Sequence, residues 1–331
     1  MNAPRIRVLA VTNMYPTTDD PTYGVFVESQ MRSIAAAGVD VRVEFIEGRR
    51  RKWRYARAIL LVRRLATSGA FDLVHAHYGL SGFVALFQPL PLIVSFCGDD
   101  LLGTPNGKRG LTAKSRLIIT LSHAAARSSA ALICKSEELR MRLPRSRDRA
   151  RAFVIPNGVD TERFAPGDRG EARARLGLDP TDLLVLFPHT PTERRKRLDL
   201  AQAAVARLEA GGVAATLMVV QRVPPARMPD FYRAADCLIV TSDWEGSPNV
   251  VKEALCCDLP VVSVDTGDVR KWLNVVPGCQ LVERDPDAIA RGLAEVLVGH
   301  RRINGQSVRD ALNSSSVARQ VVTVYQQVLA R

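Results

Sequence analysis

The sequence predicts an α/β protein made of two Rossmann-like domains, and three observations lead to this fold class. Short apolar runs alternate with amphipathic segments along the chain, which is the pattern of parallel sheets covered by helices on both faces. The chain has 331 residues, 47% of them hydrophobic, and chains longer than roughly 250–300 residues usually divide into domains. The Pro- and Gly-containing stretch Asn157–Pro166 separates two sets of predicted strands.

The apolar runs of strand length and the amphipathic segments between them predict the individual elements. In the first half the strands are Arg5–Thr12, Asp40–Phe45, Leu73–His75, Leu92–Phe96, Ala131–Cys134 and Ala152–Ile155, with helices at Val27–Ala37 and Thr112–Ser129. In the second half the strands are Leu183–Phe187, Ala215–Val220, Cys237–Thr241, Pro260–Val264 and Cys279–Val282, with helices at Asp199–Ala210, Pro229–Ala235, Pro248–Cys256 and Pro286–Val298. Ligands of such folds bind beyond the carboxyl ends of the strands, so residues that directly follow strands are the first site candidates.

Composition argues against several classes of protein. No uninterrupted apolar run reaches the roughly 18 residues of a membrane-spanning helix, and Arg5–Thr12 is too short for a signal peptide. The six cysteines form no CxxC pair and have no histidines at metal-ligand spacing, so we expect reduced thiols in a cytoplasmic protein without a zinc site. The net charge of +12 favours nucleic acid, an anionic membrane or a phosphate-bearing substrate as a neighbour, without choosing among them.

The segment Glu245–Glu253 has the properties of an anion-binding helix start. It follows a predicted strand, Ser247 is a suitable N-cap, and Pro248 suits the first helical position. A helix that begins there directs its first N–H groups at an anion such as a diphosphate, and Gly246 allows the backbone to approach a ligand closely. Glu253 lies on the polar face, where its carboxylate can accept hydrogen bonds from hydroxyls. The alternative is a surface helix with Glu253 solvated, which the rules of helix capping alone favour.

Longer stretches on both sides of this segment carry a family resemblance. They are Pro229–Asp236 before it, Glu253–Val262 after it, Val154–Asp160 with Phe164 and Pro166 at the predicted domain joint, and Gly24–Glu28 near the start. Together with the two glutamates separated by seven residues, they resemble the retaining glycosyltransferases of the GT-B fold, most closely glycosyltransferase family 4. The resemblance implies two domains facing across a cleft: an acceptor-side domain at 1–160, a donor-nucleotide domain at 161–312, and a last helix within 313–331 that packs back on the first domain.

The resemblance also assigns roles in a donor site. Glu253 contacts the nucleotide ribose, and Glu245 lies beside the transferred sugar. The backbone from Gly246 through Ser247, Pro248 and Asn249 to Val250 binds the sugar and the diphosphate.

Basic residues follow the predicted strand Leu183–Phe187. Departure of a nucleoside diphosphate develops negative charge, which preorganised cations stabilise. By resemblance Lys196 is the lysine that holds the diphosphate. Arg194 or Arg195 replaces the family's arginine, because Glu193 stands at that position here. Without the glutamate pair, a solvated basic loop is the usual interpretation of such a charge run.

The first half contributes loop residues on the acceptor side. Tyr23 and Gly24 lie in the glycine loop after the first strand, which by resemblance approaches the donor, so Gly24 is expected at the donor and Tyr23 on the acceptor side of the cleft. The family has a histidine where this chain has Cys97, so only the backbone carbonyl of Cys97 is expected to face the donor sugar. Asp99 or Asp100 either positions hydroxyl groups or caps a helix, and both interpretations stay open.

Two histidines stand near the end of the third predicted strand. His75 and His77 are two residues apart, so their side chains point the same way from a strand. No carboxylate or third histidine is near in the sequence to complete a metal site, and the family needs no metal. We therefore expect His77 to line the cleft.

The segment Arg49–Arg64 mixes cations with apolar residues and contains no acidic residue. On a helix, one stripe consists of Arg50, Arg54, Arg57 and Arg64, with Trp53, Leu60 and Leu61 beside it. Such a surface suits an anionic membrane, at about 1 kcal/mol per basic residue near the headgroups. A solvated basic face on a core helix is equally compatible. Nucleic acid is not expected, because no recognition motif accompanies the charge.

The sequence therefore predicts a retaining, metal-independent glycosyltransferase that moves a hexose from a UDP- or GDP-sugar to a hydroxyl of a saccharide or lipid-linked acceptor. The expected location is the cytoplasm or the inner face of the membrane, in polysaccharide biosynthesis. No carboxylate is placed as a nucleophile, so the departing phosphate is the predicted base. Two alternatives stay open: a nucleotide-sugar epimerase of the same fold, and a non-catalytic glycosyltransferase-like partner subunit, which Cys97 and the uncertain arginine suggest.

Overall fold

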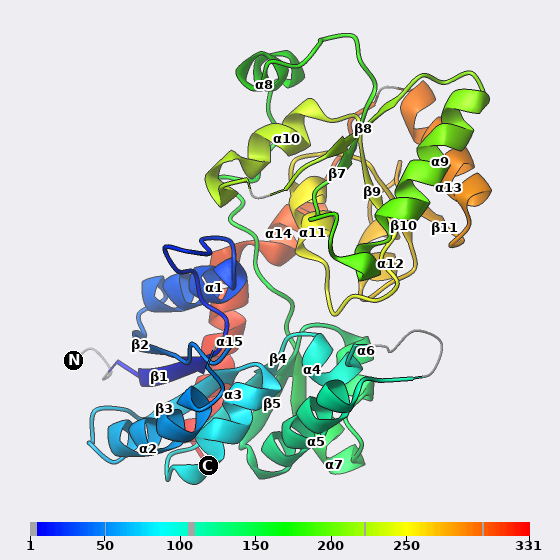
Figure 1. Ribbon diagram of the computed structural model, residues 1–331. Coiled ribbons are helices and arrows are strands. Elements are labelled where there is room, and N and C mark those ends of the chain that lie inside the picture. The colour runs from blue at the N-terminus through cyan, green and yellow to red at the C-terminus, as the bar shows by residue number, and fades with distance from the viewer. Residues whose placement is uncertain (1–4, 50, 105–109, 222, 300) are drawn as a thin grey trace. The chain divides into compact units, whose positions relative to one another are not determined.

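The computed structural model describes residues 5–49, 51–104, 110–221, 223–299 and 301–331, and it consists of two compact units (Figure 1). The first unit is Met1–Gly158 together with Ser314–Arg331, and the second is Val159–Asn313. Arg50, one of the residues in the predicted basic stripe, lies outside the described residues.

The first unit is built on a parallel sheet with the strand order β2-β1-β3-β4-β5-β6. Its strands are β1 (Arg7–Thr12), β2 (Asp40–Phe45), β3 (Leu73–His77), β4 (Leu92–Phe96), β5 (Ala131–Cys134) and β6 (Ala152–Val154). The central strands β3, β4 and β5 are buried along their whole length, which explains their nearly continuous apolar sequences.

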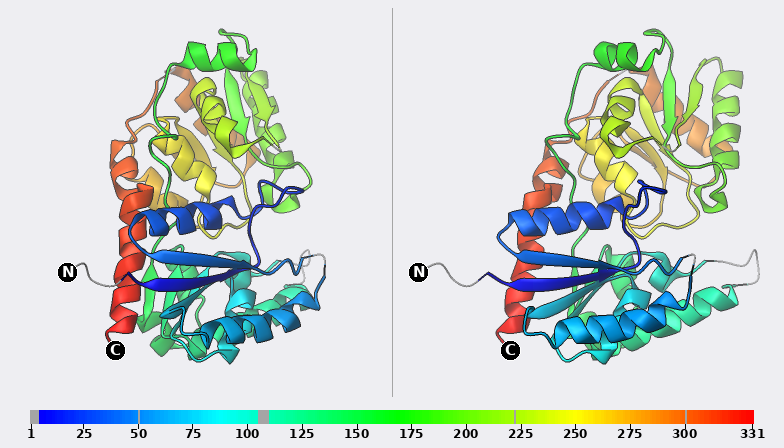
Figure 2. Two further views of the ribbon diagram at one scale, coloured as in Figure 1. Left: turned by 90° about the vertical axis from the view of Figure 1, so that its left-hand side faces the viewer. Right: turned by 60° about the vertical axis from the view of Figure 1, so that its left-hand side comes forward.

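Helices cover both faces of this sheet (Figure 2). On one face α1 (Val25–Ala36) and α15 (Ser314–Leu329) pack side by side, so the last helix in the sequence belongs to the first core. On the other face lie α2 (Arg54–Ala66), α3 (Gly79–Val84) and α5 (Ala113–Ser128). The short helices are η1 (Ala85–Phe87), α4 (Asp99–Leu102), α6 (Glu137–Met141) and α7 (Ser146–Ala150).

The second unit repeats this layered arrangement around a parallel sheet of order β11-β10-β9-β7-β8. Its strands are β7 (Leu184–Phe187), β8 (Thr216–Val219), β9 (Cys237–Val240), β10 (Val261–Val264) and β11 (Gln280–Val282). One face packs against α10 (Met228–Ala234), α11 (Asn249–Cys256), α12 (Val269–Leu273) and α14 (Gln306–Leu312), and the other against α9 (Leu198–Ala210) and α13 (Pro286–Val298). The remaining elements are α8 (Arg169–Leu176), η2 (Arg194–Lys196) and η3 (Pro225–Arg227).

The two parallel, Rossmann-like sheets confirm the predicted fold class. Each predicted strand is present, with ends that differ by at most two residues from the prediction. The prediction missed most of the short helices, because a segment of four to eight residues is too short to show a helical period.

Candidate functional site

Helix α11 begins directly behind a loop that follows β9. Its first residue is Asn249, and Pro248 occupies the N-cap position without a side-chain cap. The prediction that Ser247 caps the helix is therefore wrong: the Ser247 hydroxyl donates a hydrogen bond to Asp268 Oδ2 at 2.8 Å instead. The first turn of an α-helix leaves N–H groups without intrahelical partners, so the start of α11 keeps the character of an anion site.

Glu245 lies in this loop with only 8% of its surface exposed, and two cations hold its carboxylate. Lys196 Nζ donates to Oε1 at 2.6 Å, and Arg195 Nη1 donates to Oε2 at 2.9 Å. Burial alone would raise the pKa of Glu245, but Lys196 and Arg195 outweigh it and lower that pKa to about 2. The carboxylate is therefore charged at neutral pH, inside a buried cluster of two positive charges and one negative charge.

The turn η2 brings these cations to the loop. It follows β7, and Lys196 is as buried as Glu245. Arg194, the neighbouring candidate, is exposed, whereas Arg195 also contacts the carbonyl of Trp244 and the carboxylate of Glu193. The structure thus brings Lys196 and Arg195 together with Glu245, but not Arg194.

Glu253 lies on α11, one turn beyond the start of the helix. Its Oε2 accepts a hydrogen bond from the Tyr232 hydroxyl at 2.7 Å. Burial raises the pKa of Glu253, and the hydrogen bond from Tyr232 offsets part of that rise. Tyr232 is fully buried on α10, so it fixes the orientation of the glutamate side chain.

Several buried polar atoms around this loop have no hydrogen-bond partner among the described residues. They are His189 Nε2, Ser242 Oγ, Trp244 Nε1, Thr266 Oγ1 and Asp268 Oδ1. Buried polar groups are normally hydrogen-bonded, so a convergent set of unpartnered ones is typical of a site for a polar ligand or water. The sequence analysis missed His189, Thr266 and Asp268, although each lies shortly after a strand, at the edge where ligands bind.

The loops of the first unit bring a different set of groups to the carboxyl ends of β1, β3 and β4. Gly24 precedes α1 with a φ of +74°, and a Cβ there would overlap the backbone of Met14, so only glycine fits. Tyr23 is half-buried beside it, with the Arg49 guanidinium 4.8 Å from the centre of its ring. Burial raises the pKa of the Tyr23 hydroxyl, which therefore stays protonated.

Asp100 is fully buried and binds backbone rather than solvent. Its carboxylate accepts hydrogen bonds from the N–H groups of Gly98 at 2.8 Å, Gly79 at 2.9 Å and Cys97 at 3.1 Å. Burial raises the pKa of Asp100 to about 6 in spite of these bonds. The interpretation as a helix cap is wrong for both residues, because Gly98 occupies the N-cap position of α4 and neither α3 nor α4 has a side-chain cap. Asp100 instead binds backbone N–H groups from two loops, whereas Asp99 is exposed at the surface.

Cys97 and His77 are neutral groups. Burial raises the pKa of the Cys97 thiol, which donates only a weak hydrogen bond to the Ser95 carbonyl. His77 was expected to line a cleft, but the structure corrects this: β3 extends to residue 77, the ring is fully buried, and burial lowers its pKa well below the usual value. His75 beside it is bound by Tyr325 and Ser95 at 2.7 and 2.8 Å.

Family models match both halves of the chain. The model described as Glycosyltransferase Family 4 covers residues 5–163, and the one described as Glycosyl transferases group 1 covers residues 191–298. D-inositol 3-phosphate glycosyltransferase of Geodermatophilus obscurus is 27% identical in an alignment of 300 positions that covers 78% of this chain and 66% of that protein. The enzyme of the same name from Frankia alni is 30% identical in an alignment of 271 positions that covers 69% of this chain and 66% of that protein. The chain thus spans just under two thirds of the length of these curated relatives.

Solved structures share the fold of the whole chain. Sucrose-phosphate synthase from Thermosynechococcus elongatus matches with a TM-score of 0.80 at 18% identity, over 98% of this chain and 100% of that chain. Anabaena HepE in complex with UDP and glucose matches with a TM-score of 0.69 at 14% identity, again over 98% and 100%. At these identities the likeness establishes the fold alone.

Proposed function

The chain belongs to the family 4 glycosyltransferases of the GT-B fold, and we propose that it transfers a hexose from a UDP- or GDP-sugar to a hydroxyl of a saccharide or lipid-linked acceptor. The observation that carries this proposal is the buried cluster of Glu245, Lys196 and Arg195 beside the start of α11. Cations that bind the loop leading into the start of a helix, together with the N–H groups of that helix start, suit a diphosphate. The unpartnered polar atoms of the neighbouring loops suit the hydroxyls of a sugar.

In the proposed reaction the bond between C1 of the sugar and the diphosphate breaks, and the acceptor oxygen bonds to C1 on the same face. The acceptor proton passes to the departing phosphate, and no metal ion takes part. Lys196 and Arg195 stabilise the charge that develops on the diphosphate, a contribution of about 3–4 kcal/mol for one well-placed group. Glu245 lies beside the transferred sugar, and Glu253 binds the ribose. The N–H groups of Gly246, Ser247, Asn249 and Val250 bind the sugar and diphosphate, while Pro248, which has no N–H group, shapes the turn.

A panel of nucleotide sugars tests the donor site. A ligand at about 100 times its Kd stabilises a folded protein by about 2.7 kcal/mol, so a bound donor raises the unfolding temperature measurably. We expect a UDP- or GDP-sugar to stabilise the wild type and to stabilise Glu253→Ala much less. Equal stabilisation of both proteins would contradict the assignment of Glu253. Release of nucleoside diphosphate only when an acceptor is present then separates a transferase from an epimerase and from a non-catalytic subunit.

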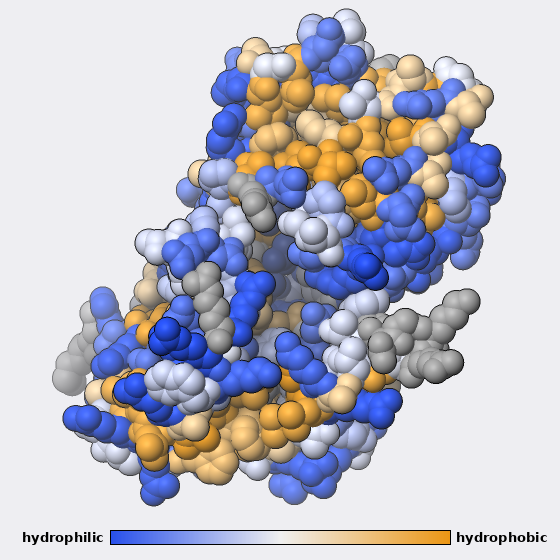
Figure 3. All heavy atoms as spheres, in the orientation of Figure 1, coloured by the Kyte–Doolittle hydropathy of each residue, from blue (hydrophilic) through white to orange (hydrophobic). Residues whose placement is uncertain are grey.

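We also propose that the first unit rests on an anionic membrane, where a lipid-linked acceptor would be reached. Helices α2 and α5 contain four and three basic residues, respectively, and neither contains an acidic one. Large apolar side chains are exposed on the same layer: Leu60 and Trp53 on and just before α2, Phe87 in η1, and Leu117 on α5. In Figure 3 apolar atoms gather along the lower edge of the first unit, among hydrophilic ones. Among the described residues, no helix is long and apolar enough to cross a membrane.

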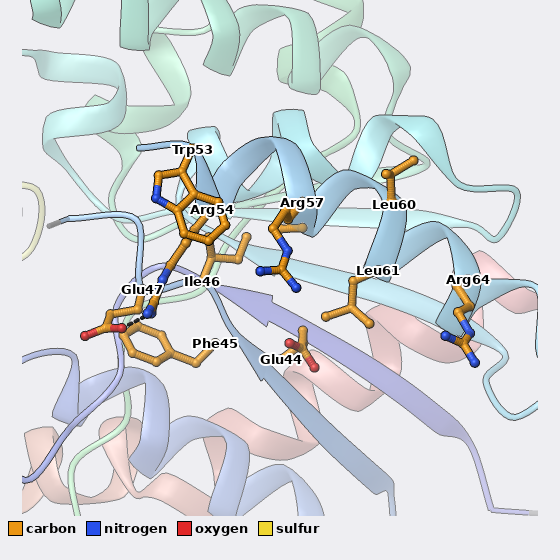
Figure 4. Close-up of a pocket in the computed structure, with 11 residues that line it drawn as sticks. Glu44, Phe45, Ile46, Glu47, Trp53, Arg54, Arg57, Leu60, Leu61 and Arg64 are labelled. Atoms are coloured by element: carbon orange, nitrogen blue, oxygen red, sulfur yellow. Dashed lines mark ion pairs between the residues drawn. The ribbon is translucent and has the colours of Figure 1, made fainter. Parts of the chain in front are cut away.

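A pocket of about 490 Å³ between α2 and the edge strand β2 adds to this surface (Figure 4). Leu60 and Leu61 line it, with Arg57 and Arg64 along the same helix. Within the described part of the chain neither guanidinium has an ion-pair partner, although Arg57 lies over the ring of Trp53 at 5.3 Å. Free cations next to exposed apolar side chains suit lipid phosphates and the acyl boundary below them.

Vesicle sedimentation tests the membrane surface. We expect binding to vesicles of phosphatidylcholine that contain phosphatidylglycerol, weaker binding as salt rises, and a clear loss in the double variant Leu60→Ser/Arg64→Ser. The control is Val298→Ser, which removes an equally exposed apolar side chain from the second unit. If vesicle binding does not depend on phosphatidylglycerol, or if the double variant binds as well as the wild type, this surface is not the membrane-binding surface.

A further inference from the structure

One lysine of the second unit has no solvent exposure at all. Lys252 lies on α11, directly before Glu253, and its helix neighbours Val251, Ala254 and Leu255 belong to the hydrophobic core. Burial lowers the pKa of Lys252, while the carboxylate of Asp268 acts in the opposite direction. A buried ammonium group is costly unless opposite charge and hydrogen-bond acceptors surround it, so its partners show what it is placed to hold.

The Lys252 ammonium group reaches two side chains outside its helix. Its Nζ contacts Ser247 Oγ and lies 3.5 Å from Asp268 Oδ2. The Ser247 hydroxyl donates to the same carboxylate oxygen at 2.8 Å, and Trp272 Nε1 donates to it at 2.8 Å. Ser247 thus accepts from Lys252 and donates to Asp268, which links the loop before α11 to the loop before α12.

The backbone of that second loop packs against the donor-site loop. Gly267 has a φ of +58°, and a Cβ there would lie 3.0 Å from the Glu245 carbonyl oxygen and 3.2 Å from Pro248 Cδ. The loop before α12 therefore supports the segment Glu245–Pro248 from beneath. Van der Waals contact between the two backbones is not directional, so it does not fix the position of the segment. The directional hydrogen bonds of Ser247 with Asp268 and Lys252 do fix it.

We propose that Lys252 is a positioning residue of the donor site. Together with Asp268 it locks Ser247, and through Ser247 it fixes the segment that carries Glu245 and the N–H groups at the start of α11. Lys252 acts through Ser247 and does not itself contact the proposed ligand. Residues of this kind commonly orient the groups that do contact a ligand. The inference rests on the proposed donor site, and it gives the Ser247 side chain a different role from that of its backbone, namely to hold the loop.

Four variants test this role: Ser247→Ala, Lys252→Met, the two combined, and Ser247→Thr. Calorimetric titration with UDP and GDP gives the Kd for each, and donor kinetics give kcat and KM. We expect each of the first two variants to weaken nucleoside diphosphate binding by about tenfold. Displaced N–H groups at the start of α11 would lose most of their hydrogen bonds to the charged phosphate. The combined variant should bind no more weakly than Lys252→Met, because both changes break one link. Ser247→Thr keeps the hydroxyl and should stay within about threefold of the wild type.

Lys114→Met is the matched control, because Lys114 is an exposed lysine on helix α5 of the first unit, outside the Lys252 network. Its Kd should equal that of the wild type. Ser247 is partly exposed, so Ser247→Ala tests the inference even if Lys252→Met fails to fold. If a folded Ser247→Ala binds like the wild type, or if the losses of affinity in Ser247→Ala and Lys252→Met add in the combined variant, Lys252 only forms a core ion pair. That result would refute the positioning role and leave the proposed donor site intact. If the wild type binds neither UDP nor GDP, the proposed donor site is wrong too.

Discussion

The two units place charge differently at the carboxyl ends of their strands. In the second unit the buried Lys196 and the half-buried Arg195 both bind the charged, buried carboxylate of Glu245. In the first unit the corresponding edge presents the protonated Cys97 thiol, the Asp100 carboxyl, to which backbone N–H groups donate, and the buried Lys135 directly after β5. Fixed charges in a low-dielectric site stabilise developing charge. The comparison therefore favours the second unit, where two cations bind one loop carboxylate, as the place of the proposed phosphate chemistry.

The largest expected effect tests whether the cluster of Lys196, Arg195 and Glu245 is required for activity. Lys196→Met should lower kcat/KM by about 10²–10³-fold, because it removes a cation from the diphosphate. It should also lower the free energy of unfolding by about 3–5 kcal/mol, since Glu245 keeps a buried charge with one partner fewer. Steady-state kinetics and urea unfolding measure the two effects. The control is Arg207→Met on the exposed face of α9, where neither quantity should change. Full activity in a folded Lys196→Met would overturn the assignment of phosphate chemistry to this cluster.

A second prediction concerns pH and the first unit. An aspartate titrates near pH 3.9 in an unfolded chain, whereas the pKa of folded Asp100 is raised to about 6. Between these two pKa values the folded protein binds more protons than the unfolded one. The contribution of Asp100 to the free energy of unfolding is therefore largest below the unfolded pKa and is lost as the pH rises through the folded pKa. Asp100 should thus remove about 3 kcal/mol of stability between pH 4 and pH 7, on the order expected for a shift of two units. The difference in unfolding free energy between the wild type and Asp100→Asn isolates this slope, and a flat difference would refute the raised pKa.

The hydrogen bond behind Glu253 gives a smaller effect. Tyr232→Phe removes the donor at 2.7 Å and leaves a buried carboxylate oxygen without it, so the pKa of Glu253 should rise further. Nucleoside diphosphate binding at pH 7 should weaken by about tenfold, the usual value of one hydrogen bond to a charged group. Calorimetric titration with UDP and GDP of the wild type and Tyr232→Phe measures this loss. Unchanged affinity in a folded Tyr232→Phe would mean that Tyr232 acts by packing alone.

The smallest effect is expected at Cys97. Its thiol is protonated and forms one weak hydrogen bond, so Cys97→Ser should change kcat by less than about threefold. Thiol-blocking reagents should also leave donor affinity unchanged. A tenfold loss of kcat in Cys97→Ser would show that the side chain itself takes part in the reaction.

The fold follows from local sequence patterns, and the location of the proposed donor site follows from the family resemblance, but the bonds within that site follow from neither. Strand and helix alternation identifies β9, α11 and the turn with Lys196, because each depends on residues close in the chain. The Ser247 hydroxyl satisfies the local rule for an N-cap, yet Asp268, 21 residues further on, takes its hydrogen bond. Glu245 and Lys196 are 49 residues apart, and only the packing of β7 beside β9 brings them together. His77 follows the alternation of a strand, but its depth in the protein depends on helices from elsewhere in the sequence.

The place of α15 in the first core has a consequence for biosynthesis. A ribosome completes the whole second unit before it releases Ser314–Leu329, the segment that covers β1 and β3 and provides Tyr325 for His75. During that interval one face of the first sheet lacks its cover, while the second unit already has every strand and helix it needs to fold. The amino-terminal half of the chain is therefore the half that finishes folding last, and for that time it carries an apolar face that a chaperone would recognise.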